Sequence, residues 1–328
     1  MNEREKLLSD IARALRRAEN IGLCGHVMPD GDCLGSELAL GLALRKMGKK
    51  VTLLSPDPVP QMYNFLPGAG DIQVQLNGQL WFDVFVSVDC SVPDRLGSFK
   101  DLLHHADRVV ILDHHAGSAN FGDFFLNDPH AGATGEIIYD LLRLLPAAMD
   151  PEVATCLYVA IITDTGSFRY ENTGPGTHRC VADLLDAGIP AVRVNKLLYE
   201  EKPLACLQVL GEVLQHLKIS ACGRVAWSSV PREMLHRFRA ADEHADGVID
   251  YLRMIKGVEL AVVFREIEPA KYKVSFRSKY YLDVNKLAAY FGGGGHIRAS
   301  ACILEGNLAE IEEHVIQTAL SSLEEAEK

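Results

Sequence analysis

The chain has 328 residues, of which 48% are hydrophobic and 23% charged, and its formal net charge is −11. This composition excludes a disordered or fibrous chain, and the length predicts about two domains. The acidic balance argues against a protein that binds long nucleic acid through its phosphates. The sequence shows no signal peptide and no apolar run near the roughly 20 residues that span a bilayer, so we expect a cytoplasmic protein without membrane contact. The eight cysteines include no C-x-x-C pair, which favours free reduced thiols.

The first half of the chain alternates short apolar segments with helical ones. The N-terminal 20 residues have the pattern of an amphipathic helix. We expect buried strands at residues 21–27, 51–56, 84–90 and 109–113, and helices at 35–47, 153–162 and 177–187. Repeated strand–helix–strand units predict an α/β domain with a parallel, doubly wound sheet. Ligands of such sheets bind at the carboxyl ends of the strands.

The pattern changes after residue 188. We expect a first domain over residues 1–188, a charged helical linker over 189–210, and a smaller α+β domain with a mixed sheet over 211–328. Strands of the second domain are predicted at 225–230, 260–264 and 272–276. Its helices are predicted near 233–235, 246–255 and 284–291, followed by a one-sided helical stripe from residue 308 onward.

The strongest local signal for a site is HVMPDGD at residues 26–32, between the first strand and its helix. On its own, an Asp-Gly-Asp turn is more often a solvated turn or a helix cap than a metal site. Polar residues also end the next strands, with Asp89 in VDCS and the triplet DHH at 113–115, and Asp164 follows a helix in TDTGSF. Each of these alone fits a cap or a polar loop. Four such clusters at one edge of a sheet indicate a binding site.

The residue types at this edge favour hard divalent cations. Histidine with several carboxylates and no cysteine suits Mn²⁺ or Mg²⁺ better than structural zinc. The carboxylates exceed what one ion needs, which suggests two ions bridged by a shared aspartate. Such ion pairs lie about 3.5–4 Å apart and stabilise both the attacking and the leaving oxygen of phosphoryl transfer.

The second domain carries a basic strand and a glycine run. Period-2 alternation in KYKVSFRSK, residues 271–279, places on one face Lys271, Lys273, Ser275, Arg277 and Lys279. A solvated sheet face has the same pattern. Four glycines precede His296, and glycines let backbone amides approach a phosphate, although no Walker A lysine is present after them. A flexible loop would also explain the glycines.

Together these motifs resemble the DHH phosphoesterase family, which takes its name from a triplet found here at 113–115. Four motifs of the first domain occur in order, HVMPDGD, VDCS, DHH and TDTGSF, and the second domain is similar to the DHH-associated domain through RS at 277–278 and GGGGH at 292–296. The length and the last two motifs are similar to the branch of oligoribonucleases (nanoRNases) and pAp phosphatases. RecJ-like exonucleases and family II pyrophosphatases share the first domain and differ in the C-terminal part of the chain.

The resemblance implies a site with two divalent ions, with Mn²⁺ favoured and Mg²⁺ as the alternative. One ion would be held by His26, Asp30 and Asp89, and the other by Asp32, Asp89, His114 and Asp164, so that Asp89 bridges them. His115 would contact the scissile phosphate or protonate the leaving oxygen, and Asp113 would orient the histidines.

The resemblance also implies a substrate-binding group in the second domain, formed by Arg277, Ser278, Gly293, Gly294, Gly295 and His296. Strict alternation sends Ser278 away from Arg277, so we expect the strand to end or bulge near Phe276 if both are to reach one ligand. Ala301 stands where a glycine is common in the family, and its methyl group is expected to narrow the phosphate pocket.

We therefore expect Mn²⁺-dependent hydrolysis of short oligoribonucleotides of about two to five residues to nucleoside 5′-monophosphates, with removal of the 3′-phosphate of pAp. The first domain would cleave the substrate, and the second domain would bind one end of it. An alternative is a phosphodiesterase for linear dinucleotides such as pApA or pGpG. An inorganic pyrophosphatase fits the second domain less well, and a catalytically inactive nucleotide sensor would be expected to lack a ligand. The oligomeric state stays open, with a homodimer as one candidate.

Overall fold

The computed structural model describes residues 2–76, 78, 80–115, 120–295 and 297–326. The chain divides into two compact units, Met1–Glu201 and Lys202–Lys328. The division falls within the stretch 189–210, where the structure has α6 (Ala191–Asn195), η4 (Lys196–Glu200) and the first half of α7 (Leu204–Gln215). Within the described ranges, no helix combines the length and the apolar character that crossing a membrane requires.

The first unit is built on a five-stranded parallel sheet with the strand order β2-β1-β3-β4-β5. This confirms the predicted α/β fold with a parallel sheet. Four strands lie where the apolar runs predict them, and β5 was not predicted. The strands are β1 (Asn20–Cys24), β2 (Lys50–Leu54), β3 (Val84–Val88), β4 (Val109–Asp113) and β5 (Phe124–Asn127).

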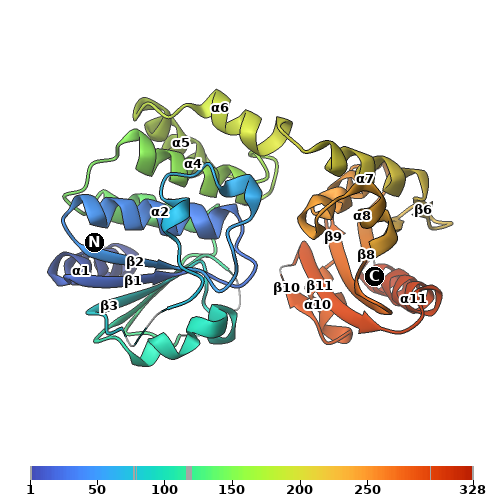
Figure 1. Cartoon of the computed structure of the whole chain (residues 1–328), viewed down its shortest axis with the longest axis horizontal. Coiled ribbons are helices and arrows are strands. Elements are labelled where there is room, and N and C mark those ends of the chain that lie inside the picture. The colour runs from blue at the N-terminus through green and yellow to red at the C-terminus, as the bar shows by residue number, and fades with distance from the viewer. Residues whose placement is uncertain (1, 77, 79, 116–119, 296, 327–328) are drawn as a thin grey trace. The chain divides into compact units, whose positions relative to one another are not determined.

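Helical segments cover both faces of this sheet, so the doubly wound arrangement is also confirmed (Figure 1). The larger core lies between the sheet and the helices, and a smaller core around Phe82 and Phe85 lies under the 3₁₀ segment η3 (Pro93–His104). Two shorter 3₁₀ turns are η1 (Gln61–Tyr63) and η2 (Ala69–Asp71). The helices of this unit are α1 (Glu3–Arg17), α2 (Gly31–Lys46), α3 (Thr134–Leu142), α4 (Pro151–Asp164) and α5 (Pro175–Asp186).

Helix α2 begins at Gly31, four residues earlier than the sequence predicts. The reason is the side chain of Asp30, whose Oδ1 accepts hydrogen bonds from the amides of Asp32 at 3.1 Å and Cys33 at 3.0 Å. An aspartate in this position satisfies amides that the first turn leaves unpaired. Asp32 therefore lies in the first turn of a helix, not in a loop.

The order of the strands creates a switch point between β1 and β3, which are hydrogen-bonded neighbours. The chain leaves β1 toward β2 on one side and leaves β3 toward β4 on the other. In open α/β sheets the loops that part at such a point leave a crevice where ligands bind. His26 comes after β1 and Asp89 after β3, so both lie at this point.

The second unit contains a six-stranded sheet with the order β10-β11-β9-β8-β7-β6, in which β7 and β8 are parallel and the other pairs antiparallel. The predicted mixed sheet is thus confirmed. The strands are β6 (Lys218–Ile219), β7 (Val225–Val230), β8 (Leu260–Glu268), β9 (Lys271–Ser278), β10 (Gly294–Gly295) and β11 (Ala299–Glu305).

Each face of this sheet has its own apolar core. One core packs the sheet against α10 (Val284–Tyr290) and α11 (Leu308–Ala326), through residues such as Phe276 and Val315. The other packs β7 and β8 against three helices, α7, α8 (Arg232–Phe238) and α9 (Val248–Arg253), with η5 (Asp242–Ala245) beside them.

Candidate metal centre

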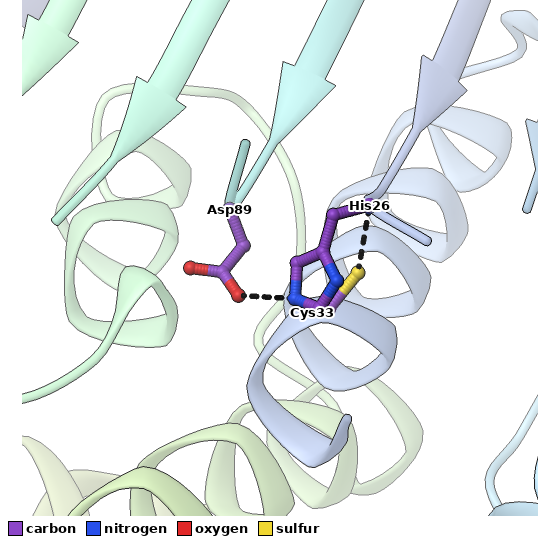
Figure 2. A group of neighbouring side chains, drawn as sticks. All are labelled: His26, Cys33 and Asp89. Carbon is purple, nitrogen blue, oxygen red and sulfur yellow. Dashed lines mark hydrogen bonds and ion pairs between the residues drawn. The ribbon is translucent and has the colours of Figure 1, made fainter. Parts of the chain in front are cut away.

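His26 lies two residues beyond β1 with 3% of its surface exposed. Its Nδ1 is 2.7 Å from the carbonyl oxygen of Val27, a contact that requires Nδ1 to carry the proton. Nε2 is then the atom that can bind a cation, and it lies 3.4 Å from Oδ2 of Asp89. Figure 2 shows His26 and Asp89 converging from neighbouring strands, with Cys33 of α2 beside the imidazole.

Asp89 is placed directly after β3 in an unusual backbone conformation. Its φ of 55° lies in the left-handed region, which residues other than glycine rarely adopt. The side chain is 1% exposed, and its two oxygens face different partners. Oδ2 faces His26, whereas Oδ1 lies 3.4 Å from Nδ1 of His115 and 3.8 Å from Nε2 of His114. A carboxylate that bridges two ions needs this orientation.

A second group of possible ligands surrounds His114. Its Nε2 lies 3.5 Å from Oδ2 of Asp32 and 3.5 Å from Oδ2 of Asp164, and its Nδ1 is 3.2 Å from the carbonyl oxygen of Ala131. Asp164 is the last residue of α4, so this ligand comes from a helix end and not from a strand. Within the described ranges, ligand atoms within 4.8 Å of one another form three groups: His26, Cys33 and Asp89; Asp89, His114 and His115; and Asp32, His114 and Asp164.

Asp32 is 1% exposed and is fixed by the start of α3. Its Oδ1 accepts hydrogen bonds from Ser36 Oγ and from the amide of Gly135, both at 3.0 Å, and its Oδ2 accepts one from the amide of Thr134 at 2.7 Å. Amides at a helix N-terminus carry a partial positive charge that stabilises a carboxylate. Oδ2 keeps acceptor capacity on the side of His114, so it is the oxygen placed to bind an ion.

Asp113 is the last residue of β4 and organises the two histidines next in the chain. Its Oδ1 accepts hydrogen bonds from the amides of His114 at 2.8 Å and His115 at 3.2 Å, and it lies 2.6 Å from Nδ1 of His115. The last contact is shorter than the 3.4 Å from the same nitrogen to Asp89. The imidazole of His115 is therefore oriented by Asp113 through Nδ1.

The crowding of these groups changes their protonation. Burial raises the pKa of Asp164 to about 7, and burial together with the charge of Asp89 raises the pKa of Asp32 well above its usual range. Burial alone would lower the pKa of His114, but Asp32, Asp89 and Asp164 raise it to about 9. Burial would also raise the pKa of Asp89, yet the hydrogen bond with His26 and the nearby histidines hold it well below its usual range.

The structure therefore brings together carboxylates that repel one another and imidazoles that gain a proton beside them. A bound cation between these groups would remove the repulsion and take the place of the protons. Carboxylate and imidazole ligands with at most one thiol are a donor set that fits divalent ions such as Mn²⁺ or Mg²⁺. Of the predicted ligands, five belong to the three groups: His26, Asp32, Asp89, His114 and Asp164.

The sixth predicted ligand, Asp30, is placed differently. It is exposed, it caps α2 through Oδ1, and it belongs to none of the groups found in the described ranges. Cys33 lies beside His26 in the first of these groups, and its Sγ accepts a hydrogen bond of 3.3 Å from the His26 amide. The position of Cys33 in the first turn after an Asp cap could have indicated this contact, but the absence of a cysteine pair argued against a ligand role.

Two further residues of the site carry weak sequence signals. Thr134 donates its hydroxyl to Oδ1 of Asp89 at 2.8 Å, and Asn172 donates Nδ2 to Oδ2 of Asp164 at 3.2 Å and to the carbonyl oxygen of Gly132 at 2.8 Å. Thr134 opens an apolar helix in the sequence TGEII, a start signal that indicates a helix but not what it contacts.

In the second unit, β9 keeps its regular alternation up to Ser278, and the bulge expected near Phe276 is absent there. The expectation was wrong because Ser278 still pairs with Leu260 of β8. Ser278 is fully buried, and its hydroxyl has no hydrogen-bond partner within the described part of the chain. Arg277 lies on the opposite face, half-buried, with NH1 donating to the carbonyl oxygen of Phe276 at 3.0 Å.

The predicted phosphate-binding glycines have mainly structural contacts. The amide of Gly293 donates to the carbonyl oxygen of Ala288 at 2.8 Å, and the amide of Gly295 donates to Asn285 Oδ1 at 2.9 Å. A Cβ at Gly293 would lie 2.2 Å from the carbonyl oxygen of Ala301, so only glycine fits. Gly294 of β10 pairs with Ala301 of the neighbouring strand β11. His296 lies outside the described residues.

Comparisons with known proteins agree on both units. A family model described as "DHH family, N-terminal domain" matches residues 20–161, and a "DHHA1 domain" model matches residues 225–326. A relative from Thermus thermophilus, named bifunctional oligoribonuclease and PAP phosphatase NrnA, is 29% identical over 325 residues, which cover 99% of this chain and 96% of the relative.

Two other proteins are similar over most of the chain. The cyclic-di-AMP phosphodiesterase PdeA of Listeria monocytogenes is 25% identical over 333 residues, which cover 95% of this chain and 49% of that protein, so the chain spans about half of its length. A crystal structure of an exopolyphosphatase-related protein from Bacteroides fragilis superposes with a TM-score of 0.88 at 25% identity, covering 98% of this chain and 96% of the other.

Proposed function

Because the chain is a phosphoesterase of the DHH family, with a DHH domain and then a DHHA1 domain, we propose that it hydrolyses short oligoribonucleotides with the help of two Mn²⁺ ions. The substrates would have about two to five residues and the products would be nucleoside 5′-monophosphates. The same site would remove the 3′-phosphate of pAp. We assign catalysis to residues 1–188, the connection to 189–210 and substrate binding to 211–328.

The observation that carries this proposal is the carboxylate of Asp89, whose Oδ2 faces His26 while Oδ1 faces His114 and His115. Ions held by the two groups that contain Asp89 would share its carboxylate. Bound divalent ions supply Lewis-acid activation of water and neutralise charge on the phosphate. The name of the Thermus thermophilus relative supports the choice of oligoribonucleotides and pAp as substrates.

Among the chain's own residues, His115 is our candidate for the general acid. Asp113 binds its Nδ1 at 2.6 Å, so the proton given to the leaving oxygen would come from Nε2. Asp113 would act as a positioning residue, because its Oδ1 also accepts the amides of both histidines. The donors around Asp32 and Asp89 would keep the carboxylates in place during turnover.

The test is an assay on 5′-end-labelled oligoribonucleotides of two to ten residues in Mn²⁺, with the Asp89→Ala variant as control. We expect faster hydrolysis of the shortest substrates, release of nucleoside 5′-monophosphates, and no activity in the variant. Equal rates at every length would overturn the restriction to short substrates. Undiminished activity of the variant would overturn the role of Asp89.

A second candidate function is hydrolysis of linear dinucleotides such as pApA and pGpG. The similarity to the cyclic-di-AMP phosphodiesterase of Listeria monocytogenes favours it, because a linear dinucleotide is a product of opening a cyclic one. Rates on pApA, pGpG, an RNA pentamer and pAp in one assay separate the two candidates. A dinucleotide enzyme would leave the pentamer and pAp largely intact.

A further inference from the structure

Glu259, the residue before β8, accepts hydrogen bonds from four consecutive amides of the loop that follows β9. Its carbonyl oxygen accepts the amide of Lys279 at 2.9 Å. Its carboxylate accepts the amides of Tyr280 at 3.1 Å, Tyr281 at 2.9 Å and Leu282 at 3.0 Å. The residue is 2% exposed, and a buried carboxylate is costly unless hydrogen bonds replace its water. The burial of Glu259 and the conformation of this loop therefore depend on each other.

Arg298 binds carbonyl groups of the same loop. Its NH1 donates to the carbonyl oxygen of Leu282 at 3.0 Å, and its NH2 donates to the carbonyl oxygen of Tyr280. The carbonyl oxygen of Arg298 accepts the amide of Ser278 at 3.1 Å, so the two segments of chain lie side by side. The amide and the carbonyl oxygen of Tyr280 are thus both bonded to charged side chains, which fixes the backbone of this residue.

The side chain on this fixed backbone is an exposed aromatic ring. Tyr280 is 66% exposed, and Nζ of Lys279 lies over its ring, 5.9 Å from the centroid. A cation in this position is attracted to the face of the ring. The same Nζ donates to the carbonyl oxygen of Ile255 at 3.1 Å, so the amine is itself held in place. One face of the ring is directed toward Lys279, and the exposed area of the side chain leaves room for a ligand on the other.

The next residue in the loop is a tyrosine with a different environment. The guanidinium carbon of Arg224 lies 5.3 Å from the centroid of the Tyr281 ring, and NH2 of the same arginine donates to the Tyr281 hydroxyl. Tyr281 is 36% exposed, about half the value of Tyr280. A single exposed aromatic side chain is ordinary on a protein surface. Tyr280 differs because its backbone is fixed while its ring stays open to solvent.

The loop lies between the two segments that we assign to substrate binding. Arg277 and Ser278 come directly before it, and the amide of Val284 at its far end donates to the carbonyl oxygen of Ile297 at 2.9 Å, just beyond the glycine run. Three residues separate Arg277 from Tyr280, a span of at most about 10 Å of extended chain. This is the scale of one nucleotide, so a nucleotide bound to these segments can place its base at the ring.

We propose that Tyr280 stacks on a nucleobase of the substrate, in a position that Glu259 and Arg298 fix through the backbone of the loop. The inference rests on the proposed function, because it requires a nucleotide substrate. Stacking on an aromatic side chain accepts every base, since each base has a π face, and this suits an enzyme that degrades RNA of any sequence. A tyrosine ring that is already held in place loses little conformational entropy when the ligand binds.

The experiment compares Tyr280→Leu with Tyr280→Phe in the full-length chain with Mn²⁺. The probe is 2-aminopurine riboside 5′-monophosphate, a fluorescent analogue of the nucleotide that the proposed reaction releases, so it is not hydrolysed further. Its fluorescence is quenched when the base stacks on an aromatic ring. The matched control is Trp81→Leu, because Trp81 is 55% exposed and precedes β3, at the other end of that strand from Asp89.

We expect the unmodified chain to quench the bound probe, and Tyr280→Leu to bind it about 5–100-fold more weakly, the range for the loss of one stacked ring. At saturation Tyr280→Leu should also quench less. Tyr280→Phe should restore both values, because the ring and not the hydroxyl makes the contact, and Trp81→Leu should change neither. Ribose 5-phosphate, which has no base, should compete with the same affinity in Tyr280→Leu and in the unmodified chain.

Equal affinity and equal quenching in Tyr280→Leu and the unmodified chain would overturn the stacking contact, as would an unmodified chain that does not bind the probe or binds it without quenching. An equal loss of affinity for ribose 5-phosphate would also overturn it, because the substitution would then have displaced the loop. These outcomes do not depend on turnover. Failure of the proposed function would appear separately, as absence of Mn²⁺-dependent hydrolysis of pAp and short RNA by a chain that quenches the probe through Tyr280.

Discussion

The hydroxyl of Thr134 donates a hydrogen bond of 2.8 Å to Oδ1 of Asp89. The amide of the same residue donates to Oδ2 of Asp32 at 2.7 Å, so the start of α3 fixes two carboxylates that come from α2 and from the end of β3. Hydrogen bonds of this kind orient metal ligands, and their loss commonly reduces metal affinity or activity 10–100-fold. Thr134 should therefore control how tightly the site binds ions.

We expect Thr134→Val to raise the half-saturating Mn²⁺ concentration by about 10–100-fold, since valine keeps the shape and loses the hydroxyl. Thr134→Ser should restore most of the affinity. The measurement is a Mn²⁺ titration of activity, supported by calorimetric titration of the metal. Thr155→Val is the matched control, because that buried threonine donates to the carbonyl oxygen of Pro151 in α4. An unchanged titration curve in Thr134→Val would contradict the role of the hydroxyl.

The metal-free protein should lose stability as the pH rises from about 5 to 8. Folding raises the pKa of Asp164 from 3.8 to about 7, so ionising it above pH 4 favours the unfolded state. Folding also raises the pKa of His114 from 6.5 to about 9, so the stability contributed by its protonated form is lost between these values. Both effects have the same sign in this pH range, and the raised pKa of Asp32 adds to them.

Binding of divalent ions should reverse this trend, because ions bind the deprotonated carboxylates of the folded state. At a concentration of 100 times Kd, a bound ion stabilises by about 2.7 kcal/mol. For a unit of about 200 residues this corresponds to a Tm increase of about 5–10 °C. Thermal unfolding at pH 5 and pH 8, in EDTA and in Mn²⁺, tests both statements. If the Tm of the metal-free protein rises from pH 5 to pH 8, the carboxylates are not crowded as described.

The parts of this site that could be predicted depend on residues that are close together in the sequence. Strands buried on both faces are continuous apolar runs, so their ends, and with them Asp89 and the triplet at 113–115, could be located directly. The switch point is a consequence of connecting such strands with helices. The resemblance to a family then added roles that the local pattern does not contain.

The parts that were missed depend on contacts between distant residues. Thr134 is separated from Asp89 by 45 positions and Gly135 from Asp32 by 103, and no local pattern states that α3 starts beside both carboxylates. Asp30 caps α2 through Oδ1, which accepts the amides of Asp32 and Cys33, and its role as a metal ligand stays a prediction. The strand β9 runs two residues further than predicted because its pairing with β8 continues.

Close packing of α2 on α4 should make Gly35 sensitive to substitution. A Cβ at this position would lie 2.4 Å from the carbonyl oxygen of Cys156 and 2.9 Å from the amide nitrogen of Ala160, both backbone atoms. We expect Gly35→Ala to lower the free energy of unfolding by about 1–3 kcal/mol, the usual result of overpacking. It should also weaken metal binding, since α2 carries Asp32 and α4 carries Asp164.

The matched control is Gly211→Ala in α7, where a Cβ meets no atom of the described residues within 4 Å. Alanine has the higher helix propensity, so this variant should gain up to about 1 kcal/mol in an exposed helix. Denaturant unfolding of the two variants and the unmodified chain measures both values. A Gly35→Ala protein as stable as the control variant would contradict the close approach of the two helices.

Arg277 and Ser278 should differ in their effect on substrate binding, although they are neighbours in one motif. Arg277 is half-buried on one face of β9, whereas the hydroxyl of Ser278 is fully buried on the other face. We expect Arg277→Met to raise KM for pAp and short RNA by about tenfold or more, because a charge-assisted contact with phosphate is lost. Ser278→Ala should leave KM within about twofold and keep or increase stability, since its buried hydroxyl has no partner in the described part of the chain. Steady-state kinetics and thermal unfolding of both variants test this difference. An equal rise in KM in the two variants would contradict it and would mean that β9 twists to present both side chains to one ligand.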